Sequence, residues 1–209
     1  MKLTVFGASG AIGGHVVRQA LDAGHKVTAV VRQSSTYADS DVEVIRVPGL
    51  TDPEALAPAL AGADAVISGV GPRRLKDAGV ASATHRVLLS ALEAAGVRRF
   101  VTVTAAPVIP PSPEEAWVVR KVLYPLISRV FRPIYADYAT MENEIRQSAT
   151  DWTVVRPPRL TNKPLSGKYR MAIEANPRGF TIGRADVAHA MLAALGDPTT
   201  IGHAIGVAG

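Results

Sequence analysis

Three glycines near the start of the chain have the spacing of a phosphate-binding turn. Gly7, Gly10 and Gly13 form the pattern G-x-x-G-x-x-G directly after a short β-rich run. The first glycine lets the chain leave a strand sharply, the second lets a diphosphate approach backbone N–H groups, and the third lets a helix pack closely on a sheet. The start of that helix adds further N–H donors and a positive dipole end. The pattern in this context predicts a dinucleotide-binding turn made of Gly7, Ala8, Ser9, Gly10, Ala11, Ile12 and Gly13.

An arginine occupies the position where NAD-specific proteins place an acid. The second β-rich run ends at Arg32, 19 residues after Gly13. An Asp or Glu there would hold the ribose hydroxyls of NAD, whereas a guanidinium pairs with the 2′-phosphate of NADP. Ser34 and Ser35 follow and can add hydroxyl donors. We therefore expect NADP(H) as the cofactor, bound in part by Arg32 and Ser35, and a solvated surface arginine is the alternative.

The elements that must position these residues alternate between strand and helix. Near-continuous apolar runs predict strands at 3–6, 26–31, 42–47, 65–70, 99–104, 152–156 and 203–207. Apolar residues at helical spacing predict helices at 11–23, 81–95, 117–131, 137–148 and 186–195, and another opens at Asp52.

Apolar strands separated by helices are typical of a parallel sheet that is covered on both faces. With right-handed crossovers the sheet becomes doubly wound. We expect an α/β protein with a Rossmann-type sheet and one domain over residues 1–209. Segments 107–136 and 157–183 break the alternation, the second as an irregular lobe, and we expect both on the substrate side, over the carboxyl ends of the strands.

The composition narrows the classes of function. The 209-residue chain is 47% hydrophobic and has no cysteine, which excludes disulfides and thiolate metal sites and suits a cytoplasmic protein. Its formal net charge is +5, and residues 156–184 contain seven basic side chains and one acid. Because neither a Lys/Arg run nor interleaved aromatic residues accompany them, we expect an anionic small molecule rather than nucleic acid. We also expect no metal ion, no membrane span, and a monomer or homodimer.

Several segments together resemble the NAD(P)H-binding family of atypical short-chain dehydrogenase/reductases. They are residues 7–13, 31–32, 152–159, 164–169 and 183–188. The sequence is most similar to the flavin reductase/biliverdin-IXβ reductase group, with NmrA-like proteins as more distant relatives. The resemblance implies an NADPH-dependent oxidoreductase that transfers hydride to a conjugated small-molecule acceptor such as a flavin, quinone or tetrapyrrole. It also implies that the nicotinamide is bordered on one side by Gly69, Val70, Gly71 and Thr104, and on the other by Pro157 and Pro158.

Two departures from that family bear on the chemistry. The active-site serine of the flavin reductases is replaced by Ala105, which leaves Thr104 as the nearest hydroxyl. The Tyr-x-x-x-Lys pair of ordinary short-chain dehydrogenases is also absent. Without that lysine a phenol keeps a pKa of about 10, which disfavours alcohol oxidation but not flavin or quinone reduction, where water supplies protons. The catalytic candidates are Thr104 and Tyr138, and Tyr135 is a candidate substrate contact, with simple packing as the alternative for both tyrosines.

Other side chains have two open interpretations. Arg156, at the end of the predicted sixth strand, either contacts the substrate or a cofactor phosphate, or pairs with a carboxylate such as Asp186. His85 is expected on the surface of its helix. The apolar segment 117–131 is a substrate lid, a dimer contact or a peripheral membrane anchor. Because the usual catalytic groups are missing, a non-catalytic NADP(H)-sensing regulator of the NmrA-like type remains the alternative function.

Overall fold

A computed structural model describes residues 1–72, 74–110, 117–118, 121 and 124–209 of the chain. Its main sheet has eight strands in the order β3-β2-β1-β4-β5-β6-β10-β8. The strands are β1 (Lys2–Phe6), β2 (Lys26–Arg32), β3 (Glu43–Val47), β4 (Ala65–Ser68), β5 (Arg99–Val103), β6 (Asp151–Arg156), β8 (Arg170–Ile173) and β10 (His203–Ala208). The helices are α1 (Gly13–Asp22), α2 (Ala57–Leu60), α3 (Val80–Ala95), α4 (Tyr124–Val130), α5 (Arg132–Gln147) and α6 (Arg184–Gly196).

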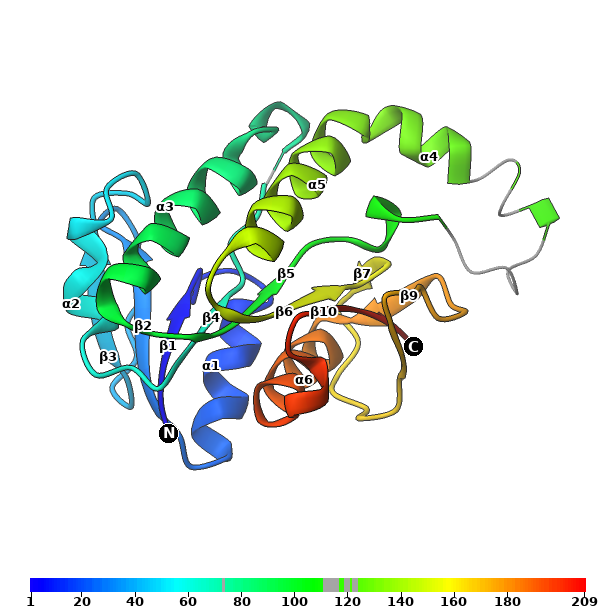
Figure 1. The fold of residues 1–209 in the computed structure, drawn as a ribbon. Helices are drawn as coiled ribbons and strands as arrows, with labels where there is room; N and C mark the ends of the chain where they lie inside the picture. The colour runs from blue at the N-terminus through cyan, green and yellow to red at the C-terminus, as the bar shows by residue number, and fades with distance from the viewer. Residues whose placement is uncertain (73, 111–116, 119–120, 122–123) are drawn as a thin grey trace.

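The sheet is doubly wound, as predicted. Strands β3 to β10 pair in parallel throughout, and only β8 joins β10 antiparallel at the edge. Helices α1 and α6 cover one face, and α3 and α5 cover the other (Figure 1). The chain winds outward from β1 toward β3 on one side and from β4 toward β10 on the other. The junction of β1 and β4 is therefore the topological switch point, where sheets of this type bind ligands.

The two faces of the sheet form two hydrophobic cores. In β5, Val101 and Val103 pack in the core beneath α1 and α6, whereas Phe100 packs in the core beneath α3 and α5. This alternation follows from the two-residue repeat of a strand, which sends successive side chains to opposite faces. Both faces are buried, which explains why the strands are almost continuously apolar.

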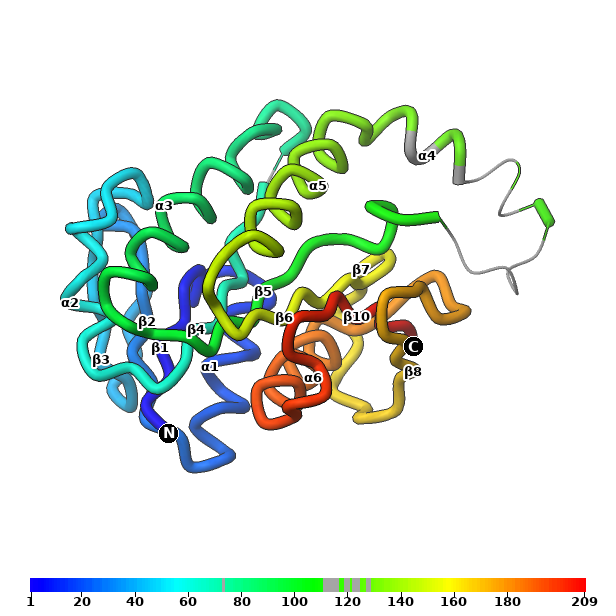
Figure 2. The backbone as a smooth tube through the Cα atoms, in the orientation of Figure 1, coloured from blue at the N-terminus to red at the C-terminus, as the bar shows by residue number. Residues whose placement is uncertain are grey.

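The segment 157–183 is more regular than predicted. β7 (Arg159–Thr161) and β9 (Thr181–Gly183) form a separate two-stranded parallel sheet. The backbone of β8 lies beside β10 at the edge of the main sheet (Figure 2). The expectation of an irregular lobe was wrong for these strands because they have only three or four residues each, which is too short to show a hydrophobic pattern.

In the described part of the segment between β5 and β6, helix α4 is followed directly by α5. α5 begins at Arg132 rather than at residue 137, and α4 runs from Tyr124 to Val130 away from the sheet (Figure 1). The predicted helix 117–131 lies partly outside the described residues. In the portions of the chain that the structure covers, no helix is long and apolar enough to span a membrane.

Candidate functional site

A cavity of about 570 Å³ opens at the switch point between β1 and β4. Its lining comes from the glycine turn after β1, the end of β2, the loop after β4, the end of β5, and parts of α3, α5, β7 and α6. Ligand pockets typically measure about 300–1,000 Å³. The cavity therefore has both the place and the size expected for a nucleotide cofactor site.

The glycine turn has the close backbone contacts that its sequence pattern predicts. Gly7 has φ +74°, a left-handed conformation that favours glycine. A β-carbon on Gly13 would lie only 2.1 Å from the Gly7 carbonyl oxygen, and one on Gly10 would lie 3.0 Å from the same atom. The Gly7 carbonyl also accepts the N–H of Gly10 at 2.8 Å. The backbone thus packs so tightly that any side chain at Gly13 would displace the turn.

The start of α1 fits the diphosphate of a dinucleotide. Gly7, Ser9, Gly10, Ala11 and Ile12 line the cavity. Among the described residues, no side chain caps the first turn of α1. The N–H of Gly14 donates to the Gly10 carbonyl at 2.8 Å, whereas no bond within the described chain engages the N–H groups of Ile12 and Gly13, which are left for a ligand. The turn could hold the phosphates through these donors and through the positive end of the helix dipole.

Arg32 lies at the adenosine end expected for such a ligand. It is the last residue of β2, its side chain lines the cavity, and it is exposed. Within the described chain its guanidinium has no hydrogen-bond or ion-pair partner. Arg46 braces the loop that follows, by donating to the carbonyl of Ser35 at 2.7 Å and to that of Tyr37 at 2.8 Å. The Ser35 hydroxyl accepts the N–H of Tyr37 at 3.2 Å, so Ser35 serves at least in part to shape this loop.

The loop after β4 brings Tyr138 to the cavity. Gly69, Val70, Gly71 and Tyr138 all line it. A β-carbon on Gly71 would come within 2.9 Å of the Tyr138 hydroxyl, and one on Gly69 within 3.2 Å of the Gly13 nitrogen. Burial, followed by the negative charge of Asp137, raises the pKa of Tyr138 to about 12. Tyr138 is therefore a neutral phenol at physiological pH, able to donate a hydrogen bond but unsuited to losing its proton.

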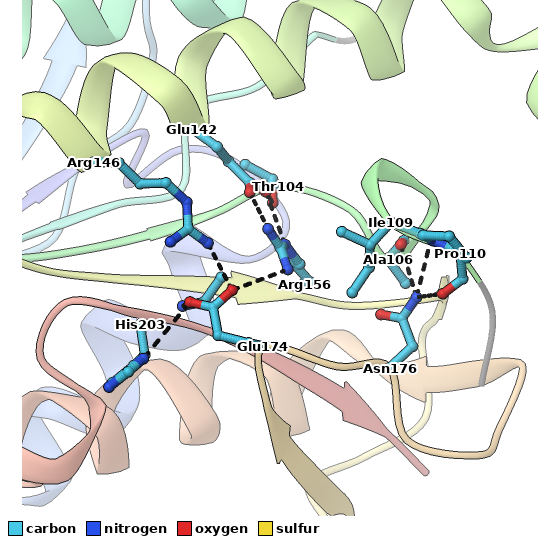
Figure 3. Close-up of polar contacts among 11 residues, drawn as sticks. Thr104, Ala106, Ile109, Pro110, Glu142, Arg146, Arg156, Glu174, Asn176 and His203 are labelled. Carbon is cyan, nitrogen blue, oxygen red and sulfur yellow. Dashed lines mark hydrogen bonds and ion pairs between the residues drawn. The ribbon is translucent and has the colours of Figure 1, made fainter. Parts of the chain in front are cut away.

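Thr104 lines the same cavity, but its hydroxyl is already engaged. Its Oγ1 donates to Oε1 of Glu142 at 2.7 Å, and the same oxygen accepts from Nε of Arg156 at 3.1 Å (Figure 3). Nη2 of Arg156 forms a second bond to the other oxygen of Glu142. Both charged side chains are almost completely buried, with 3% and 4% of their surface exposed. Thr104 therefore anchors a buried ion pair and has no proton left to give to a ligand.

This arrangement confirms one of the two interpretations of Arg156, pairing with a carboxylate, but the partner is Glu142 on α5 rather than Asp186. Arg156 is not among the residues that line the cavity, and its role as a substrate contact stays a prediction. Nη1 of Arg156 lies 3.9 Å from the carboxylate of Glu174, which in turn accepts from Arg146 at 2.7 Å (Figure 3). Arg156 therefore joins β6 to α5 and holds the end of β6 in place.

The expectation for His85 was also wrong, because this side chain is fully buried rather than on the helix surface. Its Nδ1 donates to the Ala81 carbonyl at 2.8 Å, and its Nε2 lies 3.0 Å from the hydroxyls of both Ser68 and Thr102. Burial lowers its pKa to about 4, against a smaller opposing effect of the bond to Ala81. This neutral imidazole ties α3 to the ends of β4 and β5, and the Ser68 hydroxyl next to it also accepts the N–H of Val70 at 3.4 Å.

Other predicted residues lie outside the lining of this cavity. They are Ala8, Gly13, Ser35, Tyr135, Arg156, Pro157 and Pro158. Tyr135 packs its ring on Phe131, with 6.0 Å between the ring centroids. The carbonyl of Pro157 accepts the N–H of Ala106 at 2.8 Å, which joins the chain after β6 to the loop after β5. The roles assigned to Tyr135, Pro157 and Pro158 stay predictions.

Two residues that the sequence did not single out belong to the site or support it. Arg184 lines the cavity from the start of α6. In the sequence it was only one of the seven basic residues in the segment 156–184, and no local pattern predicted that its side chain would face the cavity. Asp137 on α5 accepts the N–H groups of Ala81 and Ser82 at 3.0 and 3.1 Å, and so caps α3 from a neighbouring helix. Such a cap leaves no local motif, because the capping residue is far away in the sequence.

Comparisons with known proteins agree with this geometry. The sequence profile of the NAD(P)H-binding family matches residues 7–198. The uncharacterized sugar epimerase YhfK of Bacillus subtilis is 28% identical over 96% of this chain and 90% of its own. A short-chain dehydrogenase/reductase from Veillonella parvula, solved in complex with NADP, is 22% identical, with a TM-score of 0.80 over 100% of this chain and 94% of its own. A protein from Streptococcus pneumoniae assigned as an NADH-flavin reductase is 24% identical, with a TM-score of 0.78 over 100% and 99% of the two chains. The chain therefore belongs to the NAD(P)H-binding family, with the Rossmann-type fold that the solved structures share.

Proposed function

We propose that this protein is an NADPH-dependent oxidoreductase that reduces a conjugated acceptor such as a flavin or quinone. The observation that carries the proposal is the guanidinium of Arg32, which has no partner among the residues that the structure describes and lies in the lining of a cavity built on a glycine turn. Membership of the NAD(P)H-binding family supports the nucleotide part. The preference for NADPH over NADH rests on Arg32 and on the absence of an acid at that position.

The nature of the acceptor follows from the groups around the cavity. When bound, NADPH supplies a hydride, which is one proton and two electrons. The Thr104 hydroxyl donates its hydrogen bond to Glu142, and the pKa of Tyr138 is raised to about 12, so neither group is suited to exchange a proton with a substrate near neutral pH. A reduced quinone or flavin can take its remaining proton from water. The protein then has to bind both partners, exclude side reactions and orient them.

We assign the acceptor to the segments 107–136 and 157–183, of whose described residues Leu160 lines the cavity. Asn176 supports this assignment, because its Nδ2 donates to the carbonyls of Ala106 and Pro110, each at 3.0 Å (Figure 3). This contact ties the lobe after β6 to the loop after β5. Tyr135 and Pro158 would contribute to this acceptor side, and Pro157 would border the nicotinamide.

The proposal is tested by binding and turnover with the purified protein. Dissociation constants for NADPH and NADH would be measured by fluorescence titration, and NADPH oxidation would be followed with FMN, riboflavin and small quinones. A charge-assisted contact contributes about 1.5–3 kcal/mol, so Arg32→Ala should weaken NADPH binding by roughly 10- to 150-fold and leave NADH binding nearly unchanged. Arg178→Ala is the matched control, because it removes an exposed arginine that does not line the cavity. Equal affinity for the two nucleotides in the unmodified protein would refute the NADPH preference.

The alternative function, an NADP(H)-sensing regulator, is supported by one feature of the surface. Leu126, Val130 and Phe131 expose 61%, 54% and 39% of their surface on and beside α4, as a partner-binding segment would. The same titrations separate the two functions. Tight NADPH binding, together with no NADPH oxidation in the presence of any acceptor of the panel, would favour the sensor over the reductase.

A further inference from the structure

A second arginine, Arg184, lines the same cavity as Arg32. It is the first residue of α6, is half-buried, and lines the cavity together with Leu160 and the glycine turn. Its Nη1 donates to Oδ1 of Asn162 at 2.6 Å. Over the described part of the chain, no carboxylate lies within ion-pair distance of its guanidinium. A partly desolvated cation whose partner is a neutral amide retains its capacity to bind an anion.

The surrounding structure fixes this side chain next to the turn. Thr161 and Gly183 are paired in the parallel β7–β9 sheet, so the residues that follow them, Asn162 and Arg184, leave the two strands side by side. Gln19 on α1 donates to the Ala185 carbonyl at 2.9 Å, which holds the first turn of α6 against the helix that follows the glycine turn.

The nearest acid on α6 is not available to neutralise Arg184. Both oxygens of Asp186 accept bonds from the 166–167 loop, including the N–H groups of Ser166 and Gly167, each at 2.9 Å. The fold thus binds the acid in place with backbone donors and leaves the neighbouring arginine to face the cavity.

We propose that Arg184 binds the diphosphate of the dinucleotide, completing an anion site that the glycine turn begins. This inference rests on the proposed function, since it assigns a ligand group within the same cofactor. The N-terminus of α1 supplies N–H donors and about half a positive charge, whereas a diphosphate carries two negative charges. A guanidinium adds a full charge and can bind two phosphate oxygens at once. Arg32 would then bind the 2′-phosphate, which only NADPH carries, and Arg184 would bind the diphosphate, which NADPH and NADH share.

The test compares NADPH and NADH binding to Arg184→Gln and Arg32→Gln variants by fluorescence titration. Arg184→Gln should weaken both nucleotides by a similar factor, roughly 10-fold or more, and leave their ratio unchanged. Arg32→Gln should change the ratio. Arg184→Lys should retain part of the affinity, because it keeps the charge but loses the fork of donors. Arg159→Gln is the matched control, since Arg159 is an exposed arginine of the same small sheet that does not line the cavity.

The outcomes are distinct. Unchanged affinity for both nucleotides in a folded Arg184→Gln variant would overturn the assignment, and so would a loss confined to NADPH. Unchanged binding with a raised KM for the acceptor would overturn it in favour of an acceptor contact. If Arg184→Gln does not fold, the Asn162→Ala variant takes its place in the titration. Loss of the bond from Asn162 that orients Arg184 should weaken the binding of both nucleotides, to a smaller extent. Failure of the unmodified protein to bind either nucleotide would instead refute the proposed function itself, and the inference with it.

Discussion

Lowering the pH should destabilise this protein through His85, whose imidazole is buried and neutral. Burial lowers its pKa to about 4 from an ordinary value of 6.5. Between these two values the unfolded chain binds a proton that the folded chain excludes. The contribution of this group is therefore fully present above about pH 6.5 and is lost as the pH falls toward 4. Integrating the difference in proton binding from pH 7.5 to pH 5 gives a loss of about 2 kcal/mol in the free energy of unfolding.

Urea unfolding at the two pH values measures this loss. With a slope of about 2 kcal/mol per molar urea, the midpoint should fall by about 1 M because of His85 alone. Other groups also titrate in this range, so the comparison needs a variant that lacks the imidazole. His85→Gln removes the titrating group, and its own loss between pH 7.5 and pH 5 should be smaller than that of the unmodified protein by about 2 kcal/mol.

Ser68→Ala provides the matched control. It removes one hydroxyl 3.0 Å from Nε2 but leaves the imidazole buried, so it should lower stability at both pH values and keep the pH dependence. Equal losses in the unmodified protein and in His85→Gln would refute the reasoning. They would mean that the imidazole is exposed or already charged in the folded state, and that the hydrogen-bonded arrangement around it is wrong.

Three further substitutions test other parts of the structure. Gly13→Ala would place a β-carbon 2.1 Å from a carbonyl oxygen of the turn, so both urea stability and nucleotide affinity should fall, whereas an unchanged midpoint would contradict this packing. Asp137→Ala removes the acceptor for the first N–H groups of α3 and should cost about 1–2 kcal/mol, seen in calorimetry as a fall of about 2–8 °C in Tm. Arg156→Met leaves Glu142 buried without its charge partner and should cost about 3–5 kcal/mol, most of which a second change, Glu142→Leu, should restore. Additive losses in that double-mutant cycle would argue against the pairing.

The features that depend on local sequence could be predicted. The glycine turn follows from residue type and spacing, and its tight contacts appear at Gly7 and Gly13 as expected. The alternation of apolar strands and helices gave the parallel sheet, because a strand buried on both faces must be apolar along its length. The boundaries were less accurate where no strong signal marks them, as at the start of α5.

The partners of polar side chains could not be predicted, because they depend on which elements pack together. The end of β6 is compatible with either a cavity-lining or a core arginine, and Arg156 became a core residue because α5 brings Glu142 over it. His85 lies on an apolar helix, but its burial depends on Ser68 and Thr102 from two neighbouring strands. Among the basic residues of the segment 156–184, only the three-dimensional structure shows that Arg184 is the one lining the cavity.

The two hydroxyl groups considered as catalytic candidates, those of Thr104 and Tyr138, together restrict the acceptor. Reduction of a simple ketone to an alcohol needs a donor whose pKa lies near the working pH. Tyr138, with a pKa of about 12, is far from that range, and the proton of Thr104 is committed to Glu142. Quinones and flavins avoid this demand, because water can protonate their reduced forms. We therefore expect turnover with quinones to vary little between about pH 6 and 9, where neither hydroxyl titrates. Faster reduction of simple ketones than of quinones would show that one of these hydroxyls, or another donor, serves as an acid after all.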